Sequence, residues 1–366
     1  MRKKIMLLPR NRVRRNYMGG AGIDMLHGEK TCVDDNRPEE WIGSMTEAYN
    51  PGMPPIPGEG LAMIDDQGRM RSLRDIVDEE ISFYLADDVH PDGTWQLSFL
   101  YKILDSSMRL HVQAHPSTHF ANTRMRKPYG KLECYYILDV RQGNEGYIRL
   151  GFQHAPTREE WADIIRSQDI ARMDACFENI PVHPGEVWYI PGGMPHAIGS
   201  GITMLEIMEP SDLVVRCEFE REGIIVPPEG RFMGIGLDFC LDIFDYQSYS
   251  AQEIQEKCKI PSQAVCLAPG LEERVLIDDR LTSCFTAVQT RLHGKQVLAH
   301  APHLTLCVVT DGEGTLRASD DEEALRLRKG DSFLIAAAAE QIIAETDSVL
   351  EWTAVSPGAD MKVKHI

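Results

Sequence analysis

The sequence predicts an all-β-dominated fold made of two β-rich units with small helical insertions. Short runs rich in Val, Ile, Leu and Tyr are separated by Gly, Pro and Asn at close spacing, as in residues 134–140, 185–190 and 202–208. The length of 366 residues exceeds what one hydrophobic core usually organises. A β-rich phrase also recurs in the second half of the chain, which favours two units of one kind.

Three segments show the three-to-four-residue apolar spacing of an amphipathic helix. They are residues 72–85, 157–178 and 251–259. Thr157 followed by Glu160 fits a capping box, in which each side chain bonds the backbone of the other. We therefore expect three helices, and strands and turns almost everywhere else.

The repeated phrase consists of Gly, an acidic residue, a buried strand and a turn. It occurs at residues 185–198 and again at residues 330–343. Repetition of such a unit indicates two barrels, and the double-stranded jelly roll of the cupins fits this pattern. We predict an amino-terminal cupin domain with helical insertions over residues 1–226, a linker over 227–263 and a carboxyl-terminal cupin domain over 264–366.

The composition excludes several classes of partner. A formal charge of -18 repels nucleic acid and anionic lipid, so an anionic substrate would have to meet a locally basic pocket. No stretch approaches the roughly 20 apolar residues of a membrane span. Nine cysteines without a Cys-x-x-Cys motif fit reduced thiols. We expect a soluble, cytoplasmic monomer or homodimer that binds neither nucleic acid nor membrane.

The first fifteen residues form a basic run, with Arg or Lys at seven positions. Three interpretations stay open for it. It can be an organellar targeting segment, an entry strand with a solvated basic face, or a local basic wall of a pocket.

The strongest local signal is the segment His111-Val-Gln113-Ala-His115. Alternate side chains on a strand share one face, so these three potential ligands would line one wall. Glu133 follows 18 residues after His115, and His196 lies in a Pro-Gly-Gly-Met-Pro-His turn. Imidazole and carboxylate ligands suit zinc, manganese or iron, and a carboxamide is a weak ligand that fits a site with an exchangeable position. The second unit offers no equivalent set, so we expect it to be metal-free.

Four motifs in order resemble those of type I phosphomannose isomerases. Leu100-Tyr-Lys102-Ile-Leu is similar to the family phrase that precedes its Gln-x-His-Pro metal motif. The other three are Gly130–Tyr135, Ile190–Ala197 and Leu205–Arg216. The resemblance implies two cupin domains with a helical insertion, as in the short bacterial members.

The same resemblance implies roles for individual residues. Gln113, His115, Glu133 and His196 would hold one Zn²⁺ or another divalent metal ion. Arg216 would be the catalytic arginine, and Lys131, Glu206 and Asp212 would be polar members of the active site. Lys102 would bind the substrate through its phosphate.

The sequence departs from the family at positions that concern the substrate. His111 replaces a small hydroxyl residue that helps to bind phosphate, and we place it among the substrate-binding residues. Two amino-terminal phrases of the family are also altered, at residues 18–20 and 43–47.

The function that we predict is isomerisation of a sugar or sugar phosphate, most simply mannose 6-phosphate to fructose 6-phosphate. A proton would move between C1 and C2 through an enediolate, whose negative charge a divalent cation, Arg216 and Lys131 would stabilise. The base could be Glu206, a metal-bound hydroxide, Asp212 or Lys131. Two alternatives stay open: a cupin metalloenzyme of another class acting on a different carbohydrate, and a non-catalytic, regulatory sugar-binding cupin.

Overall fold

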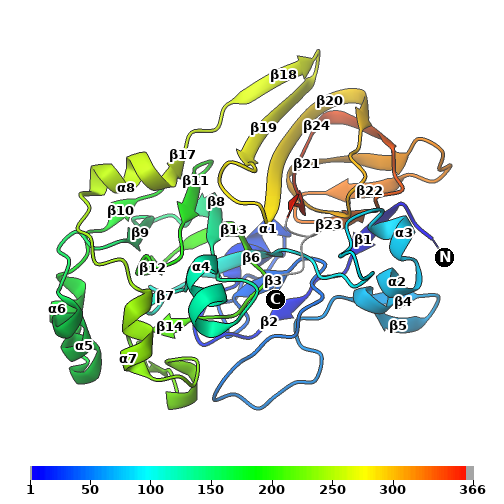
Figure 1. The fold of residues 1–366 in the computed structure, drawn as a ribbon. Helices are drawn as coiled ribbons and strands as arrows, with labels where there is room; N and C mark the ends of the chain where they lie inside the picture. Colours follow the sequence, from blue (N-terminus) through cyan, green and yellow to red (C-terminus); the bar gives the residue numbers. More distant parts are fainter. Residues whose placement is uncertain (1, 360–366) are drawn as a thin grey trace.

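We describe residues 2–359 of the chain in a computed structural model (Figure 1). Three large antiparallel sheets make up most of the molecule, and helices are few and short. The all-β-dominated class predicted from the sequence is confirmed.

The first sheet has eight strands, mostly from the carboxyl-terminal third of the chain. Its strands are β1 (Ile5–Leu8), β18 (Ala264–Ala268), β19 (Leu271–Ile277), β20 (Phe285–Ala299), β21 (Thr305–Ala318), β22 (Leu325–Arg328), β23 (Ser332–Ile335) and β24 (Gln341–Pro357). Their order is β1-β23-β21-β24-β20-β19-β18, with β22 paired to β21. The first strand of the chain therefore belongs to the same sheet as the last.

Two further sheets face each other and enclose the candidate site. The seven-stranded sheet has the order β17-β11-β8-β13-β6-β3-β2. Its strands are β2 (Arg12–Val13), β3 (Glu39–Trp41), β6 (Leu100–Ser106), β8 (Glu133–Val140), β11 (Val187–Ile190), β13 (Ile202–Met208) and β17 (Lys259–Ile260). The five-stranded sheet, ordered β10-β9-β12-β7-β14, consists of β7 (Gln113–Ala114), β9 (Tyr147–Leu150), β10 (Ile180–Pro181), β12 (His196–Ile198) and β14 (Val215–Arg216).

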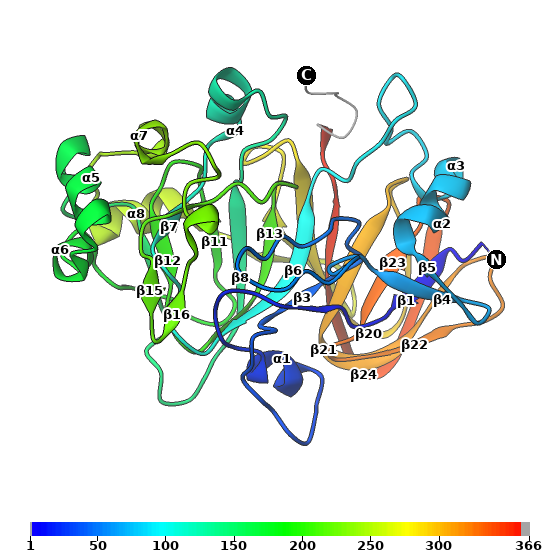
Figure 2. The same cartoon turned by 90° about the horizontal axis from the view of Figure 1, so that it is seen from below.

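The seven-stranded sheet is covered on both faces. One face packs on the five-stranded sheet through a core that includes Tyr135, Ile148 and Met204. The other packs on the eight-stranded sheet through a core that includes Tyr101 and Leu306. Figure 2 shows these layers side by side, with the carboxyl-terminal strands in orange and red. The strands that carry the candidate site are therefore held rigidly from both sides.

The repeated phrase forms equivalent strands in two sheets. Residues 187–190 become β11 and residues 332–335 become β23, each directly after a tight turn with a positive φ at Gly185 or Gly330. The division of the chain at residues 226 and 264 stays a prediction. The small hairpins are β4 (Met63–Asp66) with β5 (Arg69–Ser72), and β15 (Glu220–Arg221) with β16 (Ile224–Ile225).

The helices differ in part from the prediction. The α-helices are α1 (Ala21–Leu26), α2 (Leu73–Glu79), α3 (Ile81–Tyr84), α4 (Thr118–Phe120), α5 (Arg158–Ser167), α6 (Ile170–Asp174), α7 (Leu237–Cys240) and α8 (Ala251–Cys258). The π-helix η1 covers Ala121–Met125, and two 3₁₀ turns, η2 and η3, cover Pro228–Gly230 and Leu241–Ile243. The helix predicted at residues 251–259 is thus confirmed and ends one residue earlier.

Two of the predicted helices are each broken into a pair, so the expectation of continuous helices there is wrong. The backbone of Glu80, at φ -140°, separates α2 from α3. Gln168 adopts a left-handed φ of 52° between α5 and α6, and its side chain bonds Cys217 and Phe219 in a distant segment. Those tertiary hydrogen bonds favour a break that apolar spacing cannot indicate. The capping box of Thr157 and Glu160 is present, as predicted.

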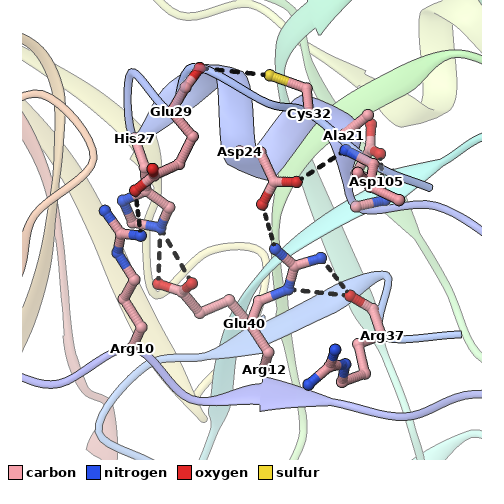
Figure 3. Close-up of polar contacts among 12 residues, drawn as sticks. Arg10, Arg12, Ala21, Asp24, His27, Glu29, Cys32, Arg37, Glu40 and Asp105 are labelled. Atoms are coloured by element: carbon pink, nitrogen blue, oxygen red, sulfur yellow. Dashed lines mark hydrogen bonds and ion pairs between the residues drawn. The ribbon is translucent and has the colours of Figure 1, made fainter. Parts of the chain in front are cut away.

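The amino-terminal segment is fixed to the seven-stranded sheet by a cluster of ion pairs (Figure 3). Arg12 donates to Asp24 at 2.8 Å. The His27 ring lies 3.0 Å from Glu40, and the side chains of His27 and Glu40 are both buried. The basic run therefore contains two strands, β1 and β2, and ends at Arg15, whose amide donates to the carbonyl of Asn36. This path leads residues 15–17 to the edge of the candidate site.

Seven of the nine cysteines are buried, which agrees with the prediction of small core residues. None of the nine forms a disulfide. Among residues 2–359, no helix is both long and apolar enough to cross a membrane.

Candidate active site

A row of side chains on the five-stranded sheet forms one wall of a polar cavity. Gln113 on β7 lies directly opposite His196 on β12 and directly opposite Arg216 on β14. Side chains of directly opposed residues point to the same face of a sheet. Strand pairing therefore brings together residues that are 83 and 103 positions apart in the sequence (196 − 113 and 216 − 113).

The seven-stranded sheet supplies the opposite wall. Lys102 on β6, Glu206 on β13 and Tyr135 on β8 lie opposite one another across three neighbouring strands. Glu133, two residues before Tyr135, shares its face because side chains alternate along a strand. The cavity between the two walls holds about 40 Å³ of free space, enough for only a few water molecules.

Three predicted ligands form a compact, buried cluster. One ligand atom each of His115, Glu133 and His196 lies within 4.8 Å of the others. His115 Nε2 is 3.1 Å from Glu133 Oε1, and His196 Nε2 is 3.5 Å from Glu133 Oε2. Gln113 Nε2 lies 3.4 Å from His196 Nε2. The structure thus brings all four predicted ligands to one place.

The hydrogen bonds around this cluster orient both imidazoles towards its centre. His115 Nδ1 lies 2.8 Å from the carbonyl oxygen of Leu213, and His196 Nδ1 lies 3.0 Å from that of Met194. A carbonyl only accepts, so each Nδ1 carries the proton, and a neutral ring then directs the lone pair of Nε2 inwards. Such second contacts are typical of histidines that bind metal ions.

The cluster fits a divalent cation on the chemistry of its donors. His115 Nε2 and Glu133 Oε1 are buried, face each other at 3.1 Å and make no directional hydrogen bond. Two opposed electron-rich atoms are unfavourable in a dry site unless a cation lies between them. Burial lowers the pKa of His115 to about 4, and burial also lowers the pKa of His196. Both rings are therefore neutral at pH 7, as ligation requires.

The predicted catalytic residues surround the cluster. Lys131 Nζ lies 3.0 Å from Glu133 Oε1, and Tyr135 donates to the other oxygen of Glu133. Burial lowers the pKa of Arg216 to about 10, so its guanidinium stays charged at pH 7. Asp212 lines the same cavity; burial opposes its charge, but Arg15, Lys131 and Arg216 outweigh this effect and lower its pKa.

Lys102 pairs with two buried carboxylates. Its Nζ lies 2.6 Å from Glu206 Oε2 and 3.4 Å from Glu39 Oε1, and its side chain is only 3 % exposed. Burial raises the pKa of Glu206, and Lys102 offsets only part of that effect because Glu39 shares its charge. A carboxyl with a raised pKa suits proton transfer near neutral pH.

His111 lines the cavity and is neutral. Burial lowers its pKa to about 4, and Nε2 lies 3.2 Å from the carbonyl of Ile224. Replacing a hydroxyl by this imidazole therefore adds bulk and no charge at pH 7. Only Gln113 and Ala114 form regular strand in this segment, so β7 is shorter than the alternation of residues 111–115 suggested.

The lining residues that the sequence did not indicate include Tyr17 and Glu39, and Arg15 belongs to the basic run for which a basic wall of a pocket was one open interpretation. Glu39 accepts hydrogen bonds from Tyr17 at 2.6 Å and from Trp41 at 2.7 Å, and Arg15 Nε lies 3.2 Å from it. The available signals were the basic run that ends at Arg15, the phrase Tyr-Met-Gly-Gly at residues 17–20 and the phrase Glu-Glu-Trp at residues 39–41. Nothing in the spacing of those phrases shows that they meet at the site.

Comparison with known proteins agrees with this architecture. No family model matches the chain. Mannose-6-phosphate isomerase ManA of Bacillus subtilis is 30% identical over 239 residues, which cover 64% of this chain and 68% of that protein. The crystal structure of mannose 6-phosphate isomerase from Bacillus subtilis matches with a TM-score of 0.69 at 18% identity, over 96% of this chain and 99% of that one.

A zinc-bound mannose 6-phosphate isomerase structure has the same fold, with a TM-score of 0.68 at 16% identity over 97% of this chain and 100% of the other. At these identities the solved structures establish the fold, and the sequence match to the ManA protein establishes the kinship. From both, and from the motifs that its cavity brings together, this chain belongs to the mannose-6-phosphate isomerase family.

Proposed function

We propose that this protein is a zinc-dependent isomerase that interconverts mannose 6-phosphate and fructose 6-phosphate. The observation that carries the proposal is the buried cluster of His115, Glu133 and His196, with Gln113 beside it, in a cavity that Arg216 and Lys131 also line. The relatives named mannose-6-phosphate isomerase support the choice of substrate.

The metal ligands would be Gln113, His115, Glu133 and His196. A bound zinc ion acts as a Lewis acid that stabilises negative charge on the sugar oxygens. Lys131 and Arg216 add fixed positive charge near the same place, in a cavity that excludes most water. Their contribution is electrostatic: the guanidinium of Arg216 keeps its charge at pH 7, and Lys131 lies 3.0 Å from the carboxylate of Glu133.

Glu206 is the base that the structure favours for moving the proton between C1 and C2. Its carboxyl is buried and its pKa is raised, so the protonated and ionised forms are close in free energy near neutral pH. Lys102, held 2.6 Å away, fixes the orientation of the carboxyl. Asp212, with its lowered pKa, is the weaker base of the two.

The test is turnover by zinc-loaded protein in deuterated water. We expect mannose 6-phosphate to give fructose 6-phosphate, with deuterium at the carbon that exchanges its proton. Glu206→Gln should slow both interconversion and deuterium incorporation roughly 10²- to 10⁴-fold and leave zinc content unchanged. Absence of interconversion with every aldose and ketose phosphate tested, in fully zinc-loaded protein, would refute the proposal.

A second arm separates catalysis from binding. A protein that binds mannose 6-phosphate in calorimetry without interconverting it would be a sugar-binding relative that has lost turnover. Oxygen consumption with an iron-loaded sample would instead indicate a metalloenzyme of another class.

A further inference from the structure

Arg15 is a cavity-lining cation that comes from the amino-terminal basic run. Its side chain is 8 % exposed, and its guanidinium lies over the Trp41 ring at 5.8 Å. Trp41 in turn donates to Glu39, which lies 3.2 Å from Arg15 Nε. The ring and the carboxylate hold the base of the guanidinium, so its terminal nitrogens are directed away from them.

Two of the other cations of the cavity, both lysines, are already paired with carboxylates. Lys102 lies 2.6 Å from Glu206, and Lys131 lies 3.0 Å from Glu133 in the metal cluster. Arg216 donates to the carbonyl of Gly230 at 2.9 Å. Arg15 has looser partners at its terminal nitrogens: Asp212 at 3.4 Å and Asn50 at 3.5 Å.

A buried arginine with a purely structural role has different contacts in this same chain. Arg109 makes a bidentate pair with Glu218, at 2.9 and 3.0 Å, and donates to its neighbour's carbonyl at 2.9 Å. Both terminal nitrogens of the Arg109 guanidinium therefore make short hydrogen bonds. The terminal nitrogens of Arg15 do not, since their contacts with Asp212 and Asn50 lie at the long limit of a hydrogen bond.

Of the two carboxylates beside Arg15, Asp212 can turn away at a lower cost in free energy than Glu39. The Asp212 side chain is 33 % exposed, whereas that of Glu39 is 2 % exposed. Asp212 can therefore turn to water while Glu39 keeps the arginine in place.

We propose that Arg15 is a specificity-determining residue, whose guanidinium exchanges the Asp212 carboxylate for the phosphate of the substrate. The inference rests on the proposed function and adds to it a residue outside the motifs shared with the family. A planar, always charged fork matches phosphate in a bidentate manner, which the ammonium of Lys102 cannot do. Lys102 is then a partner of Glu206 and Glu39 rather than a ligand of the phosphate.

The test compares a phosphorylated sugar with the same sugar without phosphate. In Arg15→Gln we expect KM for mannose 6-phosphate to rise roughly 10- to 100-fold, as for a lost charge-assisted contact. We expect kcat to change little, and kcat/KM for free mannose to stay within about twofold, since that sugar makes no charge-assisted contact with Arg15. Inhibition by inorganic phosphate should weaken in parallel.

Arg14→Gln is the matched control. Arg14 is the preceding residue and pairs with Glu59 at 2.8 Å outside the cavity, so both KM values should stay at those of the wild type. Arg15→Lys keeps the charge and loses the fork, and should give an intermediate KM. It also carries the test if Arg15→Gln does not fold.

The outcomes separate the two proposals. An equal loss of kcat/KM with mannose 6-phosphate and free mannose would overturn the role of Arg15 and leave the isomerase intact. Wild-type protein without turnover would overturn the isomerase. In that case, calorimetric titration of zinc-loaded protein with inorganic phosphate still tests Arg15, because unchanged affinity in Arg15→Lys would refute the exchange.

Discussion

Glu39 stabilises two buried cations at once, so we expect Glu39→Gln to destabilise the protein strongly. Its carboxylate lies 3.2 Å from Arg15 and 3.4 Å from Lys102 and accepts from Tyr17 and Trp41. The amide has nearly the same shape, but it carries no charge and keeps only one accepting oxygen. Both cations stay buried, and one donor loses its acceptor.

Removing one partner of a buried ion pair typically costs about 3–5 kcal/mol. We expect the lower part of that range, about 3 kcal/mol, because Lys102 keeps Glu206 and Arg15 keeps Asp212. Urea unfolding of the metal-free protein at pH 7 measures this free energy from the shift of the midpoint at constant slope. Glu40→Gln is the matched control: Glu40 is equally buried on the same strand, contacts the His27 imidazole and neither of the two cations beside Glu39, and should cost less.

The destabilisation caused by Glu39→Gln should also depend on pH. Burial alone would raise the pKa of Glu39, but Arg15 and Lys102 outweigh it and lower the pKa. The carboxylate therefore contributes stability above its unfolded pKa of about 4.3 and loses it as pH falls through the lower, folded value. The gap between wild type and Glu39→Gln should shrink in acid. A difference in unfolding free energy below about 1 kcal/mol at pH 7 would refute the reasoning, because an exposed ion pair contributes that much. A difference that stays constant as the pH falls would also refute it.

Three further predictions concern the metal, the base and one helix. His196→Ala removes a ligand, so it should lower zinc affinity by more than the roughly 10- to 100-fold that loss of a supporting contact costs. His183 is exposed and outside the cluster, so His183→Ala should leave zinc affinity unchanged. Equal zinc content by elemental analysis in the wild type and both variants would contradict the ligand set. Glu206→Gln should lower kcat roughly 10²- to 10⁴-fold with a smaller change in KM, and an unchanged kcat would exclude it as the base. Thr157→Ala removes the cap of α5 and should cost about 1 kcal/mol in thermal unfolding; no measurable loss would show that the cap contributes nothing there.

The metal site was accessible from the sequence because its signals are local. Alternation along a strand places Gln113 and His115 on one face, and a Gly-rich turn precedes His196. The fold class was accessible for the same reason, since strand length, turn residues and the repeated phrase at residues 185 and 330 are properties of short segments. The capping box of α5 likewise depends on residues three positions apart.

The alternating charges along the cavity wall were decided by the tertiary structure alone. Asp212, Arg15, Glu39, Lys102 and Glu206 lie in succession, each next to a residue of opposite charge. Arg15 and Asp212 are 197 positions apart. The sequence does not indicate that Glu39 pairs with Lys102, because the two residues become neighbours only when β3 joins the sheet beside β6.

The break at Gln168 has the same origin, because its stabilising partners belong to another segment. The sequence by itself therefore predicted the strands, through backbone periodicity over a few residues, and the candidate metal ligands, through short motifs that resemble those of the family. Only the tertiary structure decided which charges neutralise one another, because Coulomb energy in a buried site depends on distances that chain separation does not encode.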